Sequence, residues 1–213
     1  MVRKIVEKLP DEVLQKDLEK YQQKAIDLGA ADAKIVTTDT ILIDERVRAK
    51  CFVPACSSLG KNAHCPPHAL DLDFMRRVVN NFRYAIFYML KVPSDELVGP
   101  GFKEKKLGGR SAMLNWRISA QIESAAYYDG YHLAMGFAGG PCEPYLCPNQ
   151  TCRLLETKEG CRNPFRSRPS MEGVGMNALL MAAKVGWEIY PVGGSLSPTD
   201  IPHVIRLGLV LIY

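Results

Sequence analysis

Apolar residues recur every three or four positions in four stretches of the chain, which is the spacing of a helix that buries one face. These stretches are residues 11–28, 72–82, 112–128 and 170–185. Asp11 and Ser170 are expected to cap the first and last of these helices, and Gly29 and Gly186 to end them. The pattern therefore predicts amphipathic helices with one face against a core.

Between these stretches lie shorter apolar runs, rich in β-branched and aromatic residues, that predict strands. They cover residues 33–37, 41–47, 84–92, 132–137, 187–190 and 204–213. The run YAIFYMLKV at 84–92 is almost continuously apolar, which indicates a strand buried on both faces. Because helices and strands alternate, we expect an α/β or mixed α+β fold, with a central sheet flanked by about four helices. No linker is obvious, so residues 1–213 are expected to form a single domain.

The overall composition is only mildly basic, with a formal net charge of +4 and 23% charged residues. This allows an acidic partner or an anionic substrate, but the chain shows no basic stripe interleaved with aromatic residues, so we expect no nucleic acid binding. The N-terminal segment lacks the apolar core of a signal peptide, and no run approaches the roughly 20 apolar residues that span a bilayer. We therefore expect a soluble, cytoplasmic protein without membrane contact, and the oligomeric state stays open.

Seven cysteines are present, an odd number in a chain without a recognisable secretion signal. Both features argue against a framework of disulfides. Cytosolic thiols stay reduced, and clustered cysteines in that compartment are usually metal ligands or catalytic groups. The cysteines therefore carry the strongest chemical signal in the sequence.

The spacing of the cysteines repeats. Cys51, Cys56 and Cys65 form the pattern C-x4-C-x8-C, and Cys147, Cys152 and Cys161 repeat it at the same two intervals. In both copies a methionine stands ten residues after the third cysteine, and proline follows that cysteine closely. We interpret this as an internal duplication of a loop–helix unit, with candidate repeats at 41–92 and 133–190.

The second copy has an additional cysteine, Cys142, and so offers four thiolates within 20 residues. Four cysteines are the usual ligands of a [4Fe–4S] cluster. The glycine-rich stretch FAGGPCEPYLC supplies backbone that can approach a cluster closely and donate amide hydrogens to its sulfurs. The alternative is structural zinc, which also takes four cysteines but usually as two C-x2–4-C knuckles.

The first copy has three cysteines, and three interpretations compete. It holds a [4Fe–4S] cluster with one open iron; or it borrows a fourth ligand from His64, His68 or a cysteine of the other loop; or it holds no metal. An open iron is a place where substrate or an external ligand can bind, so the copy with fewer thiolates is the more suitable place for chemistry.

The segment RAKCFVPACSSLGKNAHCPP and the segment CRNPFRSRPSMEGVGMN resemble the prokaryotic "predicted metal-binding protein" family, the domain of unknown function DUF2284. The resemblance extends from about residue 32 to the end, and its strongest marks are Cys-Pro-Pro at 65–67 and Arg-Pro-Ser-Met-Glu at 168–172. The family is common in anaerobes and methanogens, and the resemblance implies metal binding, with iron–sulfur favoured over zinc. All seven cysteines match its motif positions and carry over as candidate ligands: Cys51, Cys56, Cys65, Cys142, Cys147, Cys152 and Cys161.

Cationic side chains accompany these motifs. The glycine-rich loop 99–111 carries Lys103, Lys105, Lys106 and Arg110 directly before a predicted helix, and is either a solvated loop, a lid over an anionic substrate or a docking patch for an acidic electron carrier. Three arginines follow the last cysteine and either stabilise a reduced cluster or pair with acidic neighbours. These arginines are Arg162, Arg166 and Arg168, and the acidic neighbours are Glu156, Glu159 and Glu172.

The sequence thus favours an iron–sulfur protein with one or two [4Fe–4S] clusters that passes electrons to a redox partner protein or a small-molecule substrate, as an electron-transfer protein or an oxidoreductase. Two alternatives remain at this point. One is a non-redox enzyme of the dehydratase or desulfidase type, which uses the open iron of a cluster at Cys51, Cys56 and Cys65. The other is a zinc-stabilised binding module.

Overall fold

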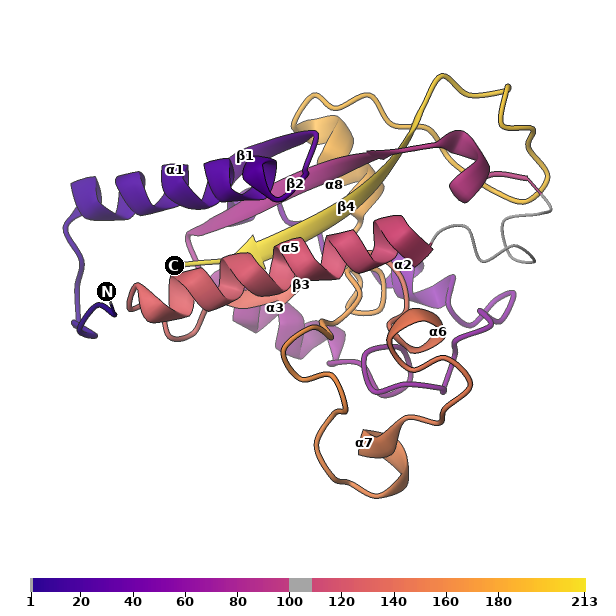
Figure 1. Cartoon of the computed structure of the whole chain (residues 1–213), viewed down its shortest axis with the longest axis horizontal. Helices are drawn as coiled ribbons and strands as arrows, with labels where there is room; N and C mark the ends of the chain where they lie inside the picture. The colour runs from indigo at the N-terminus through magenta and orange to yellow at the C-terminus, as the bar shows by residue number, and fades with distance from the viewer. Residues whose placement is uncertain (1, 100–108) are drawn as a thin grey trace.

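The computed structural model describes residues 2–99 and 109–213. In this part of the chain the centre is a four-stranded antiparallel sheet with the strand order β1-β2-β4-β3 (Figure 1). The strands are β1 (Asp32–Thr37), β2 (Tyr84–Val92), β3 (Met135–Phe137) and β4 (Val204–Leu211). The apolar run at 84–92 therefore forms an inner strand, paired on both sides.

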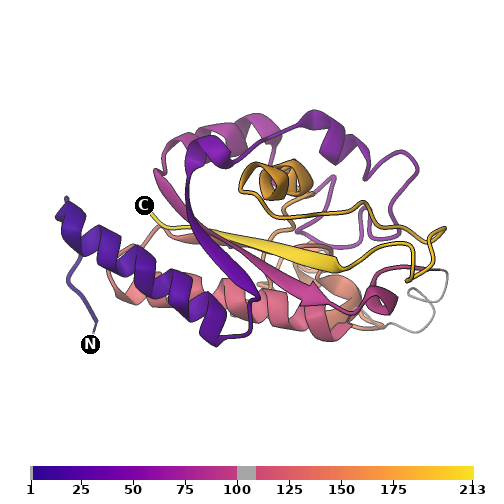
Figure 2. The ribbon, with the colours of Figure 1, turned by 90° about the horizontal axis from the view of Figure 1, so that it is seen from above.

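Two long helices cover one face of the sheet, α1 (Asp11–Asp27) and α5 (Gly109–Tyr128) (Figure 2). Side chains of β2 alternate between the two faces, and Ile86 and Tyr88 point toward these helices. Leu18 of α1 and Ile122 of α5 are fully buried against them. This face holds one of the two main hydrophobic cores.

The opposite face is covered by two shorter helices, α3 (Leu72–Asn80) and α8 (Ala178–Lys184). Phe87 of β2 lies on this side and shares a core with Met75 of α3 and Met181 of α8. Strand β2 is therefore buried on both faces, which confirms the prediction from its apolar run, and the mixed α/β class with helices around a sheet is confirmed as well.

The cysteine loops lie beyond one end of the sheet, side by side, although about 90 residues separate them in the sequence (Figure 1). Very short helical elements interrupt them and their surroundings. These are η1 (Thr38–Thr40), α2 (Glu45–Ala49), η2 (Ser94–Glu96), α6 (Glu143–Leu146) and α7 (Arg153–Glu156). The rest of both loops consists of turns and irregular backbone.

Two predicted strands are absent from the described residues. Only Ile43 in the range 41–47 makes a β-bridge, with Met176, because Asp44 accepts a hydrogen bond from the backbone of Arg46 and starts α2. The range 187–190 forms no strand, since Trp187 instead packs on Phe87 from beside the sheet. Both runs are apolar because they cover the core.

The last predicted helix begins eight residues late, at Ala178. The hydroxyl of Ser170 accepts a hydrogen bond from the backbone of Gly173, which makes a turn in place of a helix cap. Gly175 has a positive φ of 80° and ends any continuation of that turn. The cap is Asn177, whose side-chain oxygen accepts from the backbone of Leu180.

The start of α1 also differs from the expectation. Pro10 occupies the cap position without a side-chain hydrogen bond, and Asp11 lies in the first turn, where its charge favours the helix dipole. Gly29, with φ of 111°, ends this helix as predicted. Within the described ranges, no helix has the length and apolar character needed to cross a membrane. Lys103, Lys105 and Lys106 lie outside the described residues.

Candidate metal centre

Four cysteines of the second loop surround one cavity. Cys142 lies directly before α6 and Cys147 directly after it, while Cys152 lies directly before α7 and Cys161 follows that helix. The cavity between them has a volume of about 20 Å³, roughly the room of one water molecule. The structure therefore brings the four predicted ligands of this loop together. We call residues 142–169 the four-cysteine loop.

The four-cysteine loop is held to the body of the protein at its C-terminal end. Arg168 donates two hydrogen bonds to the carboxylate of Glu123 on α5, at 2.8 and 2.7 Å. The same carboxylate accepts the backbone N–H of Gly136 in β3, at 2.6 Å. Beside this pair, Ala138 and Ser170 form a parallel β-bridge. A partly buried bidentate pair of this kind fixes the loop relative to the sheet.

Hydrogen-bond donors point at the sulfurs. The backbone N–H of Asn163 donates to the sulfur of Cys161 at 3.3 Å, and its side-chain amide donates to the sulfur of Cys147 at 3.4 Å. The second contact is shared with the carbonyl oxygen of Leu146, at 3.1 Å. Asn163 thus donates to two of the four thiols, once from its backbone and once from its side chain.

Two further donors line the cavity without a hydrogen-bond partner among the described residues. They are the side-chain amide nitrogen of Asn62 and the hydroxyl of Ser167, and both residues are buried, with 1% and 6% of their surface exposed. Ser167 lies close enough to Cys142 to lower the pKa of that thiol, although their geometry is not that of a hydrogen bond. A buried donor without an acceptor is costly, so these two donors need an acceptor that belongs in the cavity.

Burial dominates the chemistry of the thiols themselves. It is the main reason that the pKa of Cys142 lies at about 11 and that of Cys65 at about 12. Neighbouring thiols act in the same direction, whereas Ser167 lowers the first value and Asn62 lowers the second. Cys142 also raises the pKa of Cys65, although the two thiols belong to different loops. A metal that binds here must therefore displace protons from buried thiols.

The three-cysteine loop, residues 51–67, also contributes to the cavity of the other loop. Asn62, Ala63 and His64 line it. His64 approaches the segment after the four-cysteine loop so closely that a side chain at Gly173 would lie 3.0 Å from the carbonyl oxygen of His64. Burial lowers the pKa of His64, and the charge of Arg168 lowers it further. The two loops form one unit.

The three cysteines of this loop differ in exposure. Cys65 is buried, Cys51 is half-buried and Cys56 is exposed. Burial raises the pKa of Cys51, and Cys56 and Glu172 raise it further.

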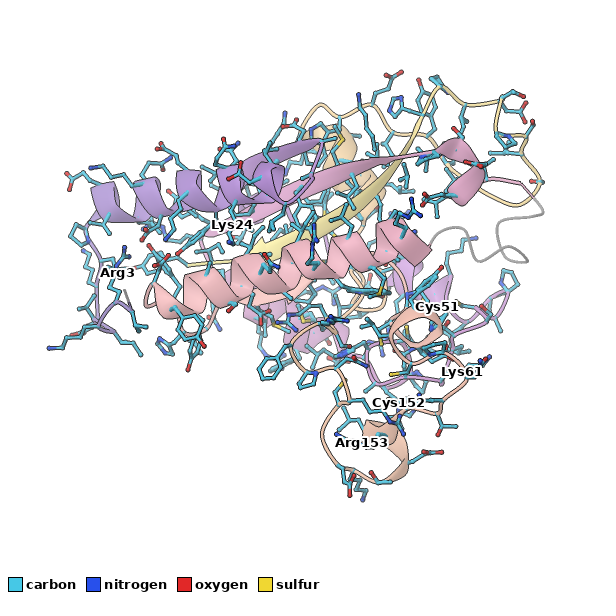
Figure 3. All side chains as sticks on the ribbon, in the orientation of Figure 1. Arg3, Lys24, Cys51, Lys61, Cys152 and Arg153 are labelled. Carbon is cyan, nitrogen blue, oxygen red and sulfur yellow. The ribbon has the colours of Figure 1, made fainter. Side chains whose placement is uncertain are left out.

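The two histidines expected as a possible fourth ligand differ in their surroundings. His64 lines the cavity of the other loop, whereas His68 is exposed at the surface. Figure 3 labels Cys51 and Cys152, one from each loop, in the same lobe.

Some of the expected contacts around the cysteines are different in the structure. The backbone N–H of Gly140 donates to the carboxylate of Glu172 at 3.2 Å, so it is already engaged. Glu172 lies in a turn and outside any helix. Arg168 pairs with Glu123 and with none of the acidic residues near it in sequence, while Glu159 pairs with Arg153 at 3.8 Å.

As the side chains lie, no three described His, Cys, Asp or Glu residues are placed to hold a single metal ion. The sequence patterns did not identify Asn62, Asn163 and Ser167 as hydrogen-bond donors of the site. Asn62 lies three positions before Cys65, and Asn163 lies two positions after Cys161. Their place beside a cysteine is the only sign in the sequence that these short polar residues belong to the site.

Three comparisons with known proteins give one finding. A family model described as "Predicted metal-binding protein (DUF2284)" matches residues 34–212, which includes both cysteine loops and the whole sheet except the start of β1. No curated protein and no solved structure matches the chain.

Proposed function

We propose that this chain, which belongs to the DUF2284 family of predicted metal-binding proteins, is an iron–sulfur protein that serves in electron transfer or as part of a redox enzyme. The observation that carries the proposal is the cavity of the four-cysteine loop. It has four thiols on its wall and two buried donors without acceptors.

The residues of this cavity suit a [4Fe–4S] cluster. Cys142, Cys147, Cys152 and Cys161 would supply its thiolates. When bound, such a cluster supplies one-electron redox chemistry at a potential set by its surroundings. Ser167 would donate a hydrogen bond toward sulfur in this cavity, whereas the side chain of Asn62 also acts on Cys65 of the other loop.

Charges near the cavity suit a thiolate-bound centre of negative net charge, although the carboxylate of Glu143 also lines it. Arg153 and Arg162 line the cavity, and Arg168 acts on the adjacent His64. Four thiolates carry more negative charge than the metal they hold, and a reduced cluster carries still more, so cationic neighbours stabilise it. The intervals between the cysteines also differ from the paired knuckles typical of structural zinc.

The three-cysteine loop is proposed as a second site. Its buried thiol, Cys65, is a neighbour of Cys142, so a second cluster there would lie close to the first. Because His64 lines the other cavity and His68 is exposed, the alternative of an open iron at Cys51, Cys56 and Cys65 is favoured over a histidine ligand. In that case this loop is the substrate site of a dehydratase or desulfidase.

The test is metal and sulfide analysis of protein purified without oxygen, together with its visible spectrum. We expect a brown protein whose broad thiolate-to-iron absorption bleaches with dithionite. About four irons per chain indicates one [4Fe–4S] cluster and about eight indicates two. A colourless protein with stoichiometric zinc would overturn the proposal and support a zinc-stabilised binding module.

A further inference from the structure

A groove lies beside the four-cysteine loop, between α5, the end of α6 and the segment that follows Cys161. It encloses about 630 Å³, within the roughly 300–1,000 Å³ typical of sites for small organic molecules. The groove is half-open, so part of a molecule bound in it would stay in contact with solvent.

The rim of this groove is cationic. Arg110 and Arg117 of α5 line it from one side and Arg166 from the other, and no aspartate or glutamate is among its described lining residues. None of these three guanidinium groups forms an ion pair within the described ranges. Arg117 donates one hydrogen bond to the carbonyl oxygen of Leu28. A positive rim without carboxylates attracts an anion.

The inner wall of the groove is apolar and aromatic. Trp116 is 1% exposed, yet its indole N–H has no hydrogen-bond partner among the described residues. Phe165 lines the same groove and is 87% exposed, which is unusual for a phenylalanine and costly in water. A flat molecule that stacks on Phe165 would remove that ring from water.

Only one layer of side chains separates the groove from the cysteines. Leu146 lines both the groove and the cavity of the four-cysteine loop. Trp116 belongs to the same hydrophobic cluster as Cys142. A molecule in the groove therefore lies next to the candidate metal centre.

We propose that this groove binds a planar organic molecule that carries phosphate or carboxylate, and that this molecule is the small-molecule reaction partner of the protein. The binding stands on the groove alone. The role as reaction partner rests on the proposed iron–sulfur function. The anionic group lies between Arg110 and Arg166, and the ring stacks on Phe165.

Flavin mononucleotide and riboflavin are suitable probes, because they share one planar ring system and differ by the phosphate. Titration calorimetry on the protein purified without oxygen gives both dissociation constants. We expect saturable binding of flavin mononucleotide and binding of riboflavin at least about tenfold weaker, as the loss of a charge-assisted hydrogen bond predicts. Absence of saturation at millimolar flavin mononucleotide, or equal affinity for the two probes, overturns the proposal.

Two variants locate the site. Arg166→Gln should weaken flavin mononucleotide by about tenfold and riboflavin little, whereas Phe165→Ala should weaken both by about fivefold through lost stacking. Both residues are exposed, so neither change disturbs the core. Arg77→Gln is the matched control, since Arg77 is an exposed arginine of α3 outside the groove. Equal effects of Arg166→Gln and Arg77→Gln would exclude the groove.

The variant Cys152→Ser separates this proposal from the iron–sulfur proposal. Cys152 lines the cysteine cavity but not the groove. A variant that has lost iron and still binds flavin mononucleotide supports a groove that does not depend on the metal. A brown wild-type protein that binds neither probe would overturn the proposed ligand site and leave the iron–sulfur proposal standing. A colourless wild-type protein that binds flavin mononucleotide would overturn the iron–sulfur proposal and leave the ligand site standing.

Discussion

The two cysteine loops have the same intervals and different surroundings. In the four-cysteine loop all thiols line one cavity, with Asn62, Asn163 and Ser167 as donors around them. In the three-cysteine loop the thiols range from buried Cys65 to exposed Cys56. The difference comes from segments that are distant in sequence, because the first loop helps to close the cavity of the second. Equal spacing therefore gives the same residue type at the same intervals without giving the same environment.

The two loops are also related through their buried cysteines. Each loop has one buried cysteine, Cys65 in one and Cys142 in the other, and Cys142 raises the pKa of Cys65. The remaining cysteines lie farther out, half-buried or exposed. The pair of loops is thus arranged with its least accessible thiols inside and its most accessible ones outside, and the predictions below test this order.

The largest expected effect is the loss of one metal site at a time. Cys152 and Cys56 are equivalent positions of the two C-x4-C-x8-C copies, so Cys152→Ser and Cys56→Ser are matched changes. If both loops hold clusters independently, each variant should lose about four irons per chain and keep about four. Iron and sulfide quantification of the two variants measures this.

Unequal iron contents of the two variants would show which loop holds the metal. Loss of iron from Cys152→Ser and none from Cys56→Ser means that the four-cysteine loop alone holds metal. Loss of all iron from both variants contradicts independence of the two sites. It would mean that the neighbours Cys65 and Cys142 belong to one assembled centre.

A smaller effect, about a hundredfold, is expected in thiol reactivity of the metal-free protein. At pH 8 a thiol with a pKa of about 11, as Cys142 has, is ionised in about one molecule in a thousand. Iodoacetamide should therefore modify the exposed Cys56 at least about a hundred times faster than Cys142. Mass spectrometry of peptides after timed quenching gives both rates.

The pH dependence gives the control for this prediction. Since burial raises the pKa of Cys142, the thiolate fraction grows tenfold per pH unit below about pH 11, and its rate of modification should rise with it. Modification of Cys142 and Cys56 at the same rate at pH 8 would show that the inner thiol is accessible and would contradict the inner and outer arrangement.

The body of the fold was predictable because its signals are local. The helix near 11–28 repeats apolar residues at helical spacing, and the strand at 84–92 is apolar on both faces, so sequence periodicity specifies each of them. The ranges 41–47 and 187–190 look like strands because they are apolar, but their apolar residues cover the core from loops. Asp44, a helix cap, was the local sign against the first.

The thiols that line the cavity were predictable from the sequence, and the residues around them were not. Cysteine spacing groups all four thiols of the cavity, because they come from one short loop. The partner of Arg168 is Glu123, 45 residues earlier on α5, and Asn62 enters from the other loop. Contacts of this kind depend on how the loops pack against the sheet, which no local pattern records.

The smallest effect concerns the donors that distinguish the four-cysteine loop. Reduction adds one negative charge to the cavity, and the hydroxyl of Ser167 would stabilise it by donating a hydrogen bond toward sulfur. Ser167→Ala should therefore lower the reduction potential of this site. A hydrogen bond of about 0.5–1.5 kcal/mol corresponds to a shift of roughly 20–60 mV for one electron. A dithionite titration followed by visible absorption measures the potential.

Ser119→Ala is the matched control, because Ser119 is also buried with an unpartnered hydroxyl but does not line the cavity. An unchanged potential in Ser167→Ala, or equal shifts in the two variants, would remove Ser167 from the set of donors and leave Asn62 and Asn163 to set the difference between the loops.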